Sequence, residues 1–167
     1  MTAQISNQIK YKGREYSVFE IMWDVSSEGF DAEMWHTANY RGWMAVFEIV
    51  NDRLFLRQLR IKHIKKEGGE PRQLLWGEVG VVEENGITRY EVNKLIEYTG
   101  KIDLLDDLAD ELYRHQGFQE KWKFRRWIEI DLDKGVVCNF LDKSLENKQR
   151  IDREIEIIEK EKCLRKF

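Results

Sequence analysis

Several features that would place a protein in a familiar class are scarce in this chain of 167 residues. It contains one proline, which argues against a loop-dominated or linker-rich protein. Its only cysteines, Cys138 and Cys163, are too few for the disulfide framework of a small secreted domain. The first residues lack the basic start and apolar run of a signal peptide, and no apolar run approaches the ~20 residues of a membrane helix. We therefore expect a cytoplasmic protein without a membrane segment.

The sequence also lacks the short motifs that identify catalytic, metal and phosphate sites. The three histidines, His36, His63 and His115, stand alone, without the close spacing typical of zinc ligands. There is no G-x-S-x-G nucleophile elbow and no glycine-rich phosphate loop. The net charge of −3 gives no general attraction to nucleic acids. We therefore expect no catalytic residue, no metal and no cofactor, and we favour a protein that is not an enzyme.

Turn signals between apolar, strand-like runs dominate the rest of the chain. Turns are expected at Tyr11-Lys12-Gly13-Arg14, Asn51-Asp52, Asn85-Gly86 and Asp133-Lys134-Gly135. Asn85-Gly86 is the strongest of these hairpin signals, because both residues tolerate positive φ angles. In the second hairpin, pairing across the turn places one set of residues on a single face. This predicted core face consists of Trp43, Ala45, Phe47, Ile49, Leu54 and Leu56.

Two segments have helical spacing. Leu104, Leu105, Leu108 and Leu112, among several aspartates, predict a short acidic helix, and residues 145–165 predict a long helix whose apolar face includes Ile151, Ile155 and Ile158. The fold class expected is α+β, with an antiparallel twisted sheet or partly open barrel and these two helices. Residues 1–143 form the sheet-rich domain, and residues 144–167 form a helix that belongs to the same domain or to an interface.

A basic and aromatic stretch runs from Lys121 to Trp127. Strand alternation places Trp122 and Phe124 on the apolar face and exposes the opposite set, through which nucleic acid could bind by stacking and phosphate contacts. The exposed candidates are Lys121, Lys123, Arg125 and Trp127. Because the whole chain is acidic, we do not favour nucleic acid as the partner.

A second candidate site surrounds Arg41, where large aromatic residues meet an asparagine, an arginine and a glycine at the start of a strand. Arg41 could bind an anionic group while aromatic rings stack on a ligand. The structural alternative is a closed sheet corner in which Arg41 pairs with Glu48. The candidate pocket residues are Trp35, His36, Asn39, Tyr40, Arg41, Trp43, Glu48 and His115.

Four short motifs carry a resemblance to a known family. They are Thr37-Ala38-x-x-Arg41-Gly42-Trp43, Phe47-Glu48-Ile49-x-Asn51-Asp52-x-Leu54-x-Leu56, Tyr98-Thr99-Gly100-Lys101-Ile102 and Tyr113-x-His115-x-Gly117-Phe118. Through them the region from Trp35 to Leu141 resembles a family of bacterial proteins that has no assigned activity. The resemblance implies a bacterial source and a shared scaffold, and no catalytic residue. It also suggests that Tyr98, Gly100, His115 and Gly117 lie near the first motif.

On these grounds we favour a bacterial binding or interaction protein whose partner is another protein or a second copy of the chain, paired through the C-terminal helix. An immunity-type protein that neutralises a toxin would have this size and charge. The alternatives are an enzyme or sensor that binds a small molecule around Arg41, and a nucleic-acid-binding protein.

Overall fold

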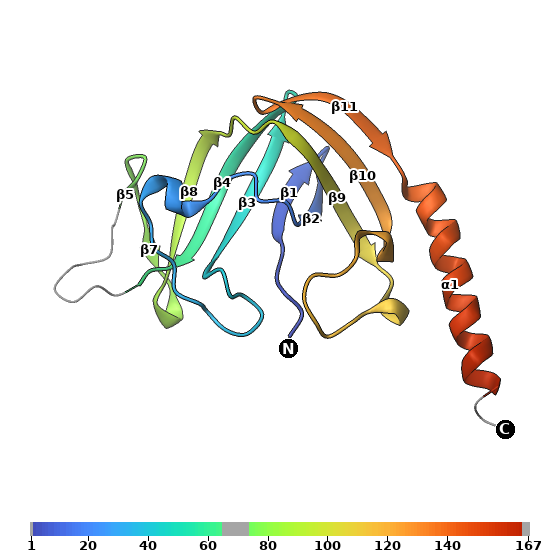
Figure 1. The fold of residues 1–167 in the computed structure, drawn as a ribbon. Coiled ribbons are helices and arrows are strands. Elements are labelled where there is room, and N and C mark those ends of the chain that lie inside the picture. The colour runs from blue at the N-terminus through green and yellow to red at the C-terminus, as the bar shows by residue number, and fades with distance from the viewer. Residues whose placement is uncertain (1, 65–73, 165–167) are drawn as a thin grey trace.

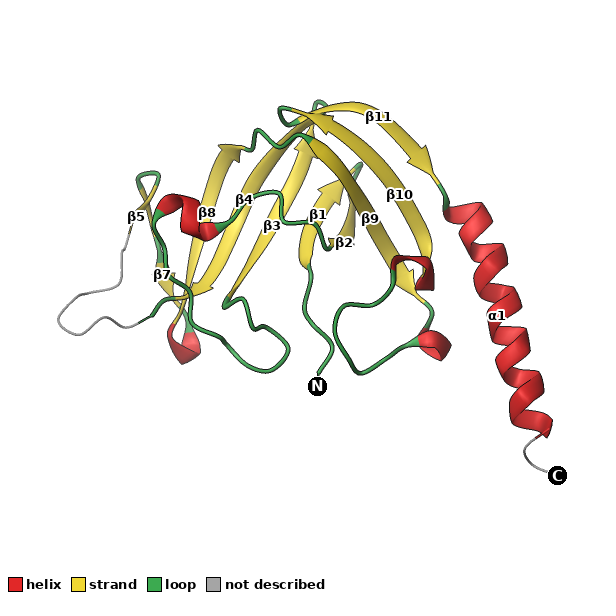
Figure 2. Cartoon of the chain, in the orientation of Figure 1, coloured by secondary structure: helices red, strands yellow, loops and turns green. Residues whose placement is uncertain are grey.

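The computed structural model describes residues 2–64 and 74–164 and has an α+β fold, as Figures 1 and 2 show. One curved sheet makes up most of it, and a long C-terminal helix lies beside that sheet. The predicted fold class is therefore confirmed. The strands are β1 (Asn7–Tyr11), β2 (Arg14–Val18), β3 (Trp43–Val50), β4 (Arg53–Lys62), β5 (Leu74–Leu75), β6 (Glu78–Val79), β7 (Val81–Val82), β8 (Ile87–Leu95), β9 (Gly100–Leu108), β10 (Phe124–Asp133) and β11 (Val136–Asp142). The helices are α1 (Ser144–Leu164) and the short 3₁₀ helices η1 (Val25–Glu28), η2 (Glu84–Gly86), η3 (Asp110–Leu112) and η4 (Lys121–Lys123).

Within the described residues, nine strands form the large sheet in the order β11-β10-β9-β2-β1-β3-β4-β8-β7. β1 and β3 are parallel, and the other neighbouring pairs are antiparallel. β11 also pairs with β4, through Val136 and Arg53, and the N–H of Leu54 donates to the carbonyl of Gly135 beside this pair, at 2.8 Å. The sheet therefore curls into a barrel that is closed at this end, while its strands fan apart toward the other end (Figure 1).

The predicted hairpin turns explain how the strands are joined. Lys12-Gly13, Asn51-Asp52 and Lys134-Gly135 all have positive φ angles, between 47° and 78°. Such angles suit the tight turns whose twist matches that of the paired strands. At Asn85-Gly86 the φ angles are also positive, but the chain forms η2 there. The short strand β7, before η2, pairs with β8, which follows it.

The apolar core fills the inside of the barrel. The six predicted core residues of the β3–β4 hairpin are all buried, and none is more than 7% exposed. One extra residue in β4, Arg57, interrupts its register, so that the buried positions change from Leu54 and Leu56 to Leu59 and Ile61. Such a bulge bends the strand and increases its twist, which suits the curvature of a barrel.

The acidic segment differs from its prediction. Residues 100–108 form β9 rather than a helix, and only the single turn η3 of Asp110–Leu112 follows. Four consecutive residues, Ile102 to Leu105, are buried because both faces of β9 are covered. A strand that is buried on both faces carries leucines on either side, so its spacing resembles that of a helix.

The C-terminal helix agrees with its prediction over residues 144–164, while Arg165 lies outside the described residues. Ile151 is fully buried against Ala109 and Leu112, and Trp122, Ile155 and Ile158 pack around them. The chain itself therefore buries Ile151 fully and Ile155 and Ile158 in part. None of the described helices is long and apolar enough to cross a membrane.

Asn147 anchors the same helix through its side chain. It is 5% exposed, and its Nδ2 donates to the carbonyls of Trp122, at 2.9 Å, and of Phe124, at 2.6 Å. Because these carbonyls belong to η4 and to the first residue of β10, the helix is fixed to the sheet by hydrogen bonds as well as by apolar contact.

His63 holds the connection between β2 and β3 against the barrel. Its Nε2 lies 3.2 Å from the hydroxyl of Tyr90, and its ring lies 5.2 Å from that of Phe30. Burial lowers the pKa of His63 below its usual value near 6.5. The unfolded chain therefore takes up this proton at a higher pH than the folded protein does.

We expect His63 to make folding sensitive to acid. Below pH ~6.5 the unfolded state binds the extra proton, so the contribution of His63 to stability is present at neutral pH and is lost as the pH falls. Urea unfolding at pH 7.5 and 5.5 measures this loss, which should be smaller in His63→Gln. Equal losses in the wild type and the variant would assign the acid sensitivity to other groups.

Candidate functional site

All the residues predicted around Arg41 except Glu48 lie at the open end of the barrel, but they do not line one pocket. His36 and Asn39 shape the chain before β3: the N–H of Ala38 donates to His36 Nδ1, and Asn39 Oδ1 accepts from the N–H of Gly42. Asn39 Nδ2 donates to the carbonyl of Trp43. Asn39 is 2% exposed, so its role is to hold this turn.

The other pocket candidates point in different directions. Trp35 stacks on Arg60, with 5.6 Å between the guanidinium carbon and the ring centre, and Tyr40 is 53% exposed. His115 lies on an exposed loop, with its ring 4.8 Å from that of Tyr113. The eight candidate residues therefore do not line a single pocket.

Arg41 does not pair with Glu48, so the closed-corner prediction is wrong on this point. Glu48 accepts from Arg57 at 2.7 Å, because strand alternation places it on the outer face of β3. Arg41 stacks on Trp43 instead, 4.8 Å from its ring centre, and Phe118 lies on another side at 6.0 Å.

The N-terminal segment joins two of the motifs that carry the family resemblance. The N–H of Ile5 donates to the carbonyl of Ala38, and the N–H of Gln4 donates to that of Gly117, both at 2.8 Å. The expectation that Gly117 lies near the first motif therefore holds. For Tyr98 and Gly100 the expectation is wrong, because they lie at the start of β9 near the closed end of the barrel, where the N–H of Gly135 donates to the carbonyl of Tyr98.

The basic and aromatic stretch is a turn followed by a strand, not one continuous strand. Lys121–Lys123 form η4, and as a result Lys123 is only 2% exposed instead of pointing outward. Lys121 pairs with Glu20 and Asp103, and Trp127 Nε1 also donates to Asp103. Arg125 pairs with Asp107, at 3.6 Å, and with Glu111, at 3.2 Å. Lys123 pairs with Glu120, at 3.4 Å, so carboxylates face all three cations and the indole N–H, which weakens the field that a phosphate backbone would meet.

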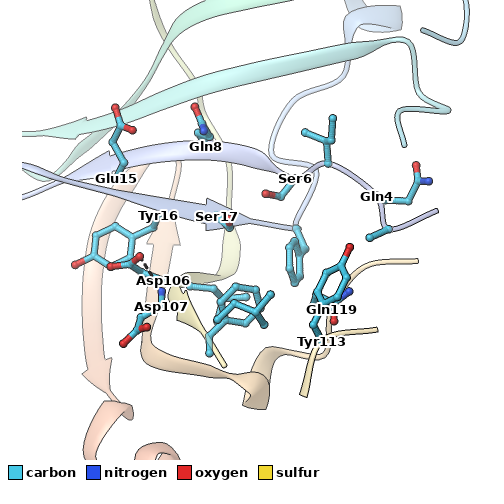
Figure 3. A pocket seen from close by; sticks show the side chains of 16 residues that line it. Gln4, Ser6, Gln8, Glu15, Tyr16, Ser17, Asp106, Asp107, Tyr113 and Gln119 are labelled. Carbon is cyan, nitrogen blue, oxygen red and sulfur yellow. Dashed lines mark hydrogen bonds between the residues drawn. The ribbon is translucent and has the colours of Figure 1, made fainter. Parts of the chain in front are cut away.

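A cleft of about 510 Å³ opens where β2 crosses β9, whose described backbones pair at Ser17 and Leu105 alone (Figure 3). The N-terminal segment and the loop that carries Tyr113 and Gln119 form its other sides. The 16 lining residues are Ala3, Gln4, Ile5, Ser6, Gln8, Glu15, Tyr16, Ser17, Phe19, Leu105, Asp106, Asp107, Leu108, Tyr113, Gln119 and Phe124.

Aromatic side chains form the apolar part of the cleft. Phe19 lies at the centre of a cluster, with its ring 5.1 Å from that of Phe118 and 5.9 Å from that of Phe124. Phe124 is 6% exposed, so the base of this cluster is fixed within the fold. The cluster also connects the cleft with Arg41, because Phe118 contacts both Phe19 and the guanidinium.

Polar groups without protein partners surround this apolar part. Among residues 2–64 and 74–164, no group forms a hydrogen bond with the side chains of Ser6, Gln8, Ser17 or Tyr113. Gln4 and Gln119, by contrast, bond to the backbone of Thr37 and of Arg114. The free hydroxyl and amide groups can therefore bind a ligand without breaking a bond of the fold.

The charges of the cleft are balanced. Glu15 pairs with Lys10, at 3.5 Å, and Asp106 pairs with Arg14, at 3.3 Å, and with Arg126, at 3.4 Å. Burial raises the pKa of Tyr16, which keeps its hydroxyl neutral. The cleft therefore suits polar, uncharged groups better than a strong ion of either sign.

Two carboxylates also cap the edge of β9 beside the cleft. The N–H of Asp103 donates to Glu20 Oε2, at 3.2 Å, and the N–H of Asp107 donates to Asp106 Oδ1, at 2.8 Å. The positive φ of Asp107, 59°, turns the strand out of line at this point. Two N–H groups at this edge therefore already have acceptors, so a ligand must be held mainly by side chains.

The part of the chain that the structure describes contains no group of three or more His, Cys, Asp or Glu residues arranged to hold a metal ion. Cys138 and Cys163 are free and exposed. Neither family models nor curated proteins nor solved structures give a significant match to the chain. The geometry of the site is therefore the only guide to function.

Proposed function

We propose that the protein is a binding module that holds a segment of a partner protein in the cleft between β2 and β9. The observation that carries this proposal is the row of unbonded groups on Ser6, Gln8, Ser17 and Tyr113 beside the aromatic side chains Phe19 and Phe124. A polypeptide supplies both complements, since its amides bond to the hydroxyl and amide groups while its apolar side chains contact the rings.

The shape of the cleft favours a polypeptide over a free small molecule. Sites for small molecules bury most of their ligand, whereas this cleft is only partly enclosed. A segment that remains attached to a larger partner gains further contacts outside the cleft, so partial burial is sufficient. The setting expected from the sequence is the bacterial cytoplasm, and a toxin neutralised by an immunity-type protein is one such partner.

Blocking the cleft should abolish this binding. Gln8 is exposed on the outer face of β1, so Gln8→Trp fills the cleft without entering the core. Peptides selected from a random display library on the wild-type protein should bind Gln8→Trp at least about tenfold more weakly by isothermal titration calorimetry, a loss of about 1.4 kcal/mol or more.

Gln58→Trp is the matched control, because the sheet places Gln8, Val46 and Gln58 in one row on three neighbouring strands and only Gln8 lines the cleft. It should bind the selected peptides as the wild type does. A double variant, Ser6→Ala with Ser17→Ala, tests the hydroxyl groups without adding bulk. The proposal is contradicted if the selected peptides bind Gln8→Trp and the double serine variant as tightly as the wild type, or if the library yields no binder.

A further inference from the structure

Arg41 lies at the open end of the barrel, and several of its N–H groups have no acceptor among the described residues. Its Nη2 donates to the carbonyl of Ile5, at 3.2 Å, and to Asn7 Oδ1, at 3.3 Å, and both acceptors are neutral. A guanidinium has five N–H donors, and Nε and Nη1 of Arg41 have no acceptor among the described residues. No carboxylate in the same part of the chain forms an ion pair with it.

Comparison with another stacked arginine of the sheet shows that Arg41 lacks a carboxylate partner. Arg57 lies over the ring of Phe55, at 5.0 Å, and it also donates to Glu48 at 2.7 Å. Arg41 has the same kind of stacking on Trp43 without a carboxylate. Desolvation lowers the pKa of Arg41, because burial disfavours a charge that no neighbouring anion compensates in full.

Asn7 provides a second donor in the same place. It is fully buried, and its Oδ1 accepts from the N–H of Ala45, at 3.1 Å, as well as from Arg41. These two donors fix the orientation of the amide, since a flipped Asn7 would turn its own N–H groups toward them. In this orientation Asn7 Nδ2 has no partner among the described residues, although a buried donor without an acceptor costs about 1–3 kcal/mol.

We propose that Arg41 and Asn7 form a binding site for a carboxylate group. A carboxylate accepts two parallel hydrogen bonds from one guanidinium, and Asn7, which accepts from Arg41 Nη2, carries the unpaired buried amide N–H beside this pair. Trp43 and Phe118 flank the guanidinium and keep its fork in place. A phosphate dianion would need more positive charge than one arginine supplies, and the negative charge of Asp24 acts on the same site.

The carboxylate has two possible sources with the same chemistry. It is an acidic side chain or C-terminus of the partner segment, in which case this inference rests on the proposed function, or it is a free small carboxylate, in which case it does not. The aromatic cluster Phe19–Phe118 links the cleft to Arg41 and makes the first source geometrically direct.

NMR of the arginine Nε–H groups in the full chain tests the site. Titration with sodium acetate, at constant ionic strength against sodium chloride, should shift the Arg41 resonance in a saturable way, and sodium phosphate should shift it less. Arg57, which already has Glu48, is the internal control and should not respond. Arg41→Lys keeps the charge but loses the fork, so it should bind acetate at least about tenfold more weakly, as judged from the Asn7 amide resonance.

Peptides distinguish the two sources. A cleft-binding peptide should bind the wild type at least about tenfold more weakly when its carboxylates are replaced by amides. The amide peptide should then bind Arg41→Lys as tightly as it binds the wild type. An acetate shift without this peptide effect supports the site and identifies a free carboxylate as its ligand. If acetate leaves Arg41 unshifted, or phosphate binds more tightly than acetate, the carboxylate site is disproved, while binding in the cleft can still stand on the Gln8→Trp result.

Discussion

Replacing Gly42 with alanine is expected to destabilise the protein by about 3–5 kcal/mol, through backbone strain and overpacking together. Gly42 has a φ of 74°, and a Cβ atom there would overlap the carbonyl oxygen of Glu33. This contact cannot relax easily, because the N–H of Glu33 donates to Lys62, whose own N–H donates to Gly42. Urea unfolding measures the effect as a shift of the midpoint at constant slope.

Gly13→Ala is the matched control for this variant. Gly13 has almost the same φ, 75°, but a Cβ atom there would meet nothing within 4 Å. Gly13→Ala should therefore destabilise the protein only through its left-handed backbone, by about 1–2 kcal/mol. If both variants lose the same amount, the close approach of Gly42 to Glu33 is not a constraint on the fold.

Ile151→Asp should release α1 from the sheet. Ile151 is fully buried against Ala109 and Leu112, and an aspartate there would place an unpaired charge in an apolar cluster. We expect a loss of at least about 3 kcal/mol, which increases the opening of the helix more than 100-fold in hydrogen exchange. Exchange of the strand amides in the barrel should change much less, because the helix has an apolar cluster of its own.

Ile157→Asp makes the same chemical change on the other side of the helix. Ile157 is 51% exposed, so its replacement should alter stability by no more than about 0.5 kcal/mol. If Ile151→Asp destabilised the barrel strands as much as the helix, the two clusters would form one cooperative unit. If Ile157→Asp also released the helix, helix propensity rather than packing would hold it.

The sequence predicts most of the sheet because local rules determine its hairpins. Positive-φ turn residues such as Asn51-Asp52, together with alternating apolar positions, identify the strands and their inward faces without any knowledge of the rest of the fold. The prediction fails at β9, where burial on both faces places Leu104 and Leu105 next to each other and removes the alternation. It fails also at Lys121–Lys123, where a 3₁₀ turn disrupts the alternation before β10 begins.

The candidate site could be predicted only in part. Arg41 and Trp43 are visible in the sequence because an arginine among aromatic residues is unusual at a strand entrance. Ser6, just before β1, and the strand residues Gln8 and Ser17 are ordinary polar residues, and they become a site only because β2 crosses β9, with Ser17 and Leu105 as their backbone pair. That crossing depends on contacts between segments far apart in the chain, which no local pattern records.

The pair between Val136 and Arg53 has a consequence for the order in which the protein folds. It joins two hairpins that are distant in sequence, so its formation must pay the entropy of closing a long loop. The β3–β4 and β10–β11 hairpins each turn on two residues and can form early and independently. The seam between them should therefore close last, and until it does, the apolar interior remains accessible to other unfolded chains.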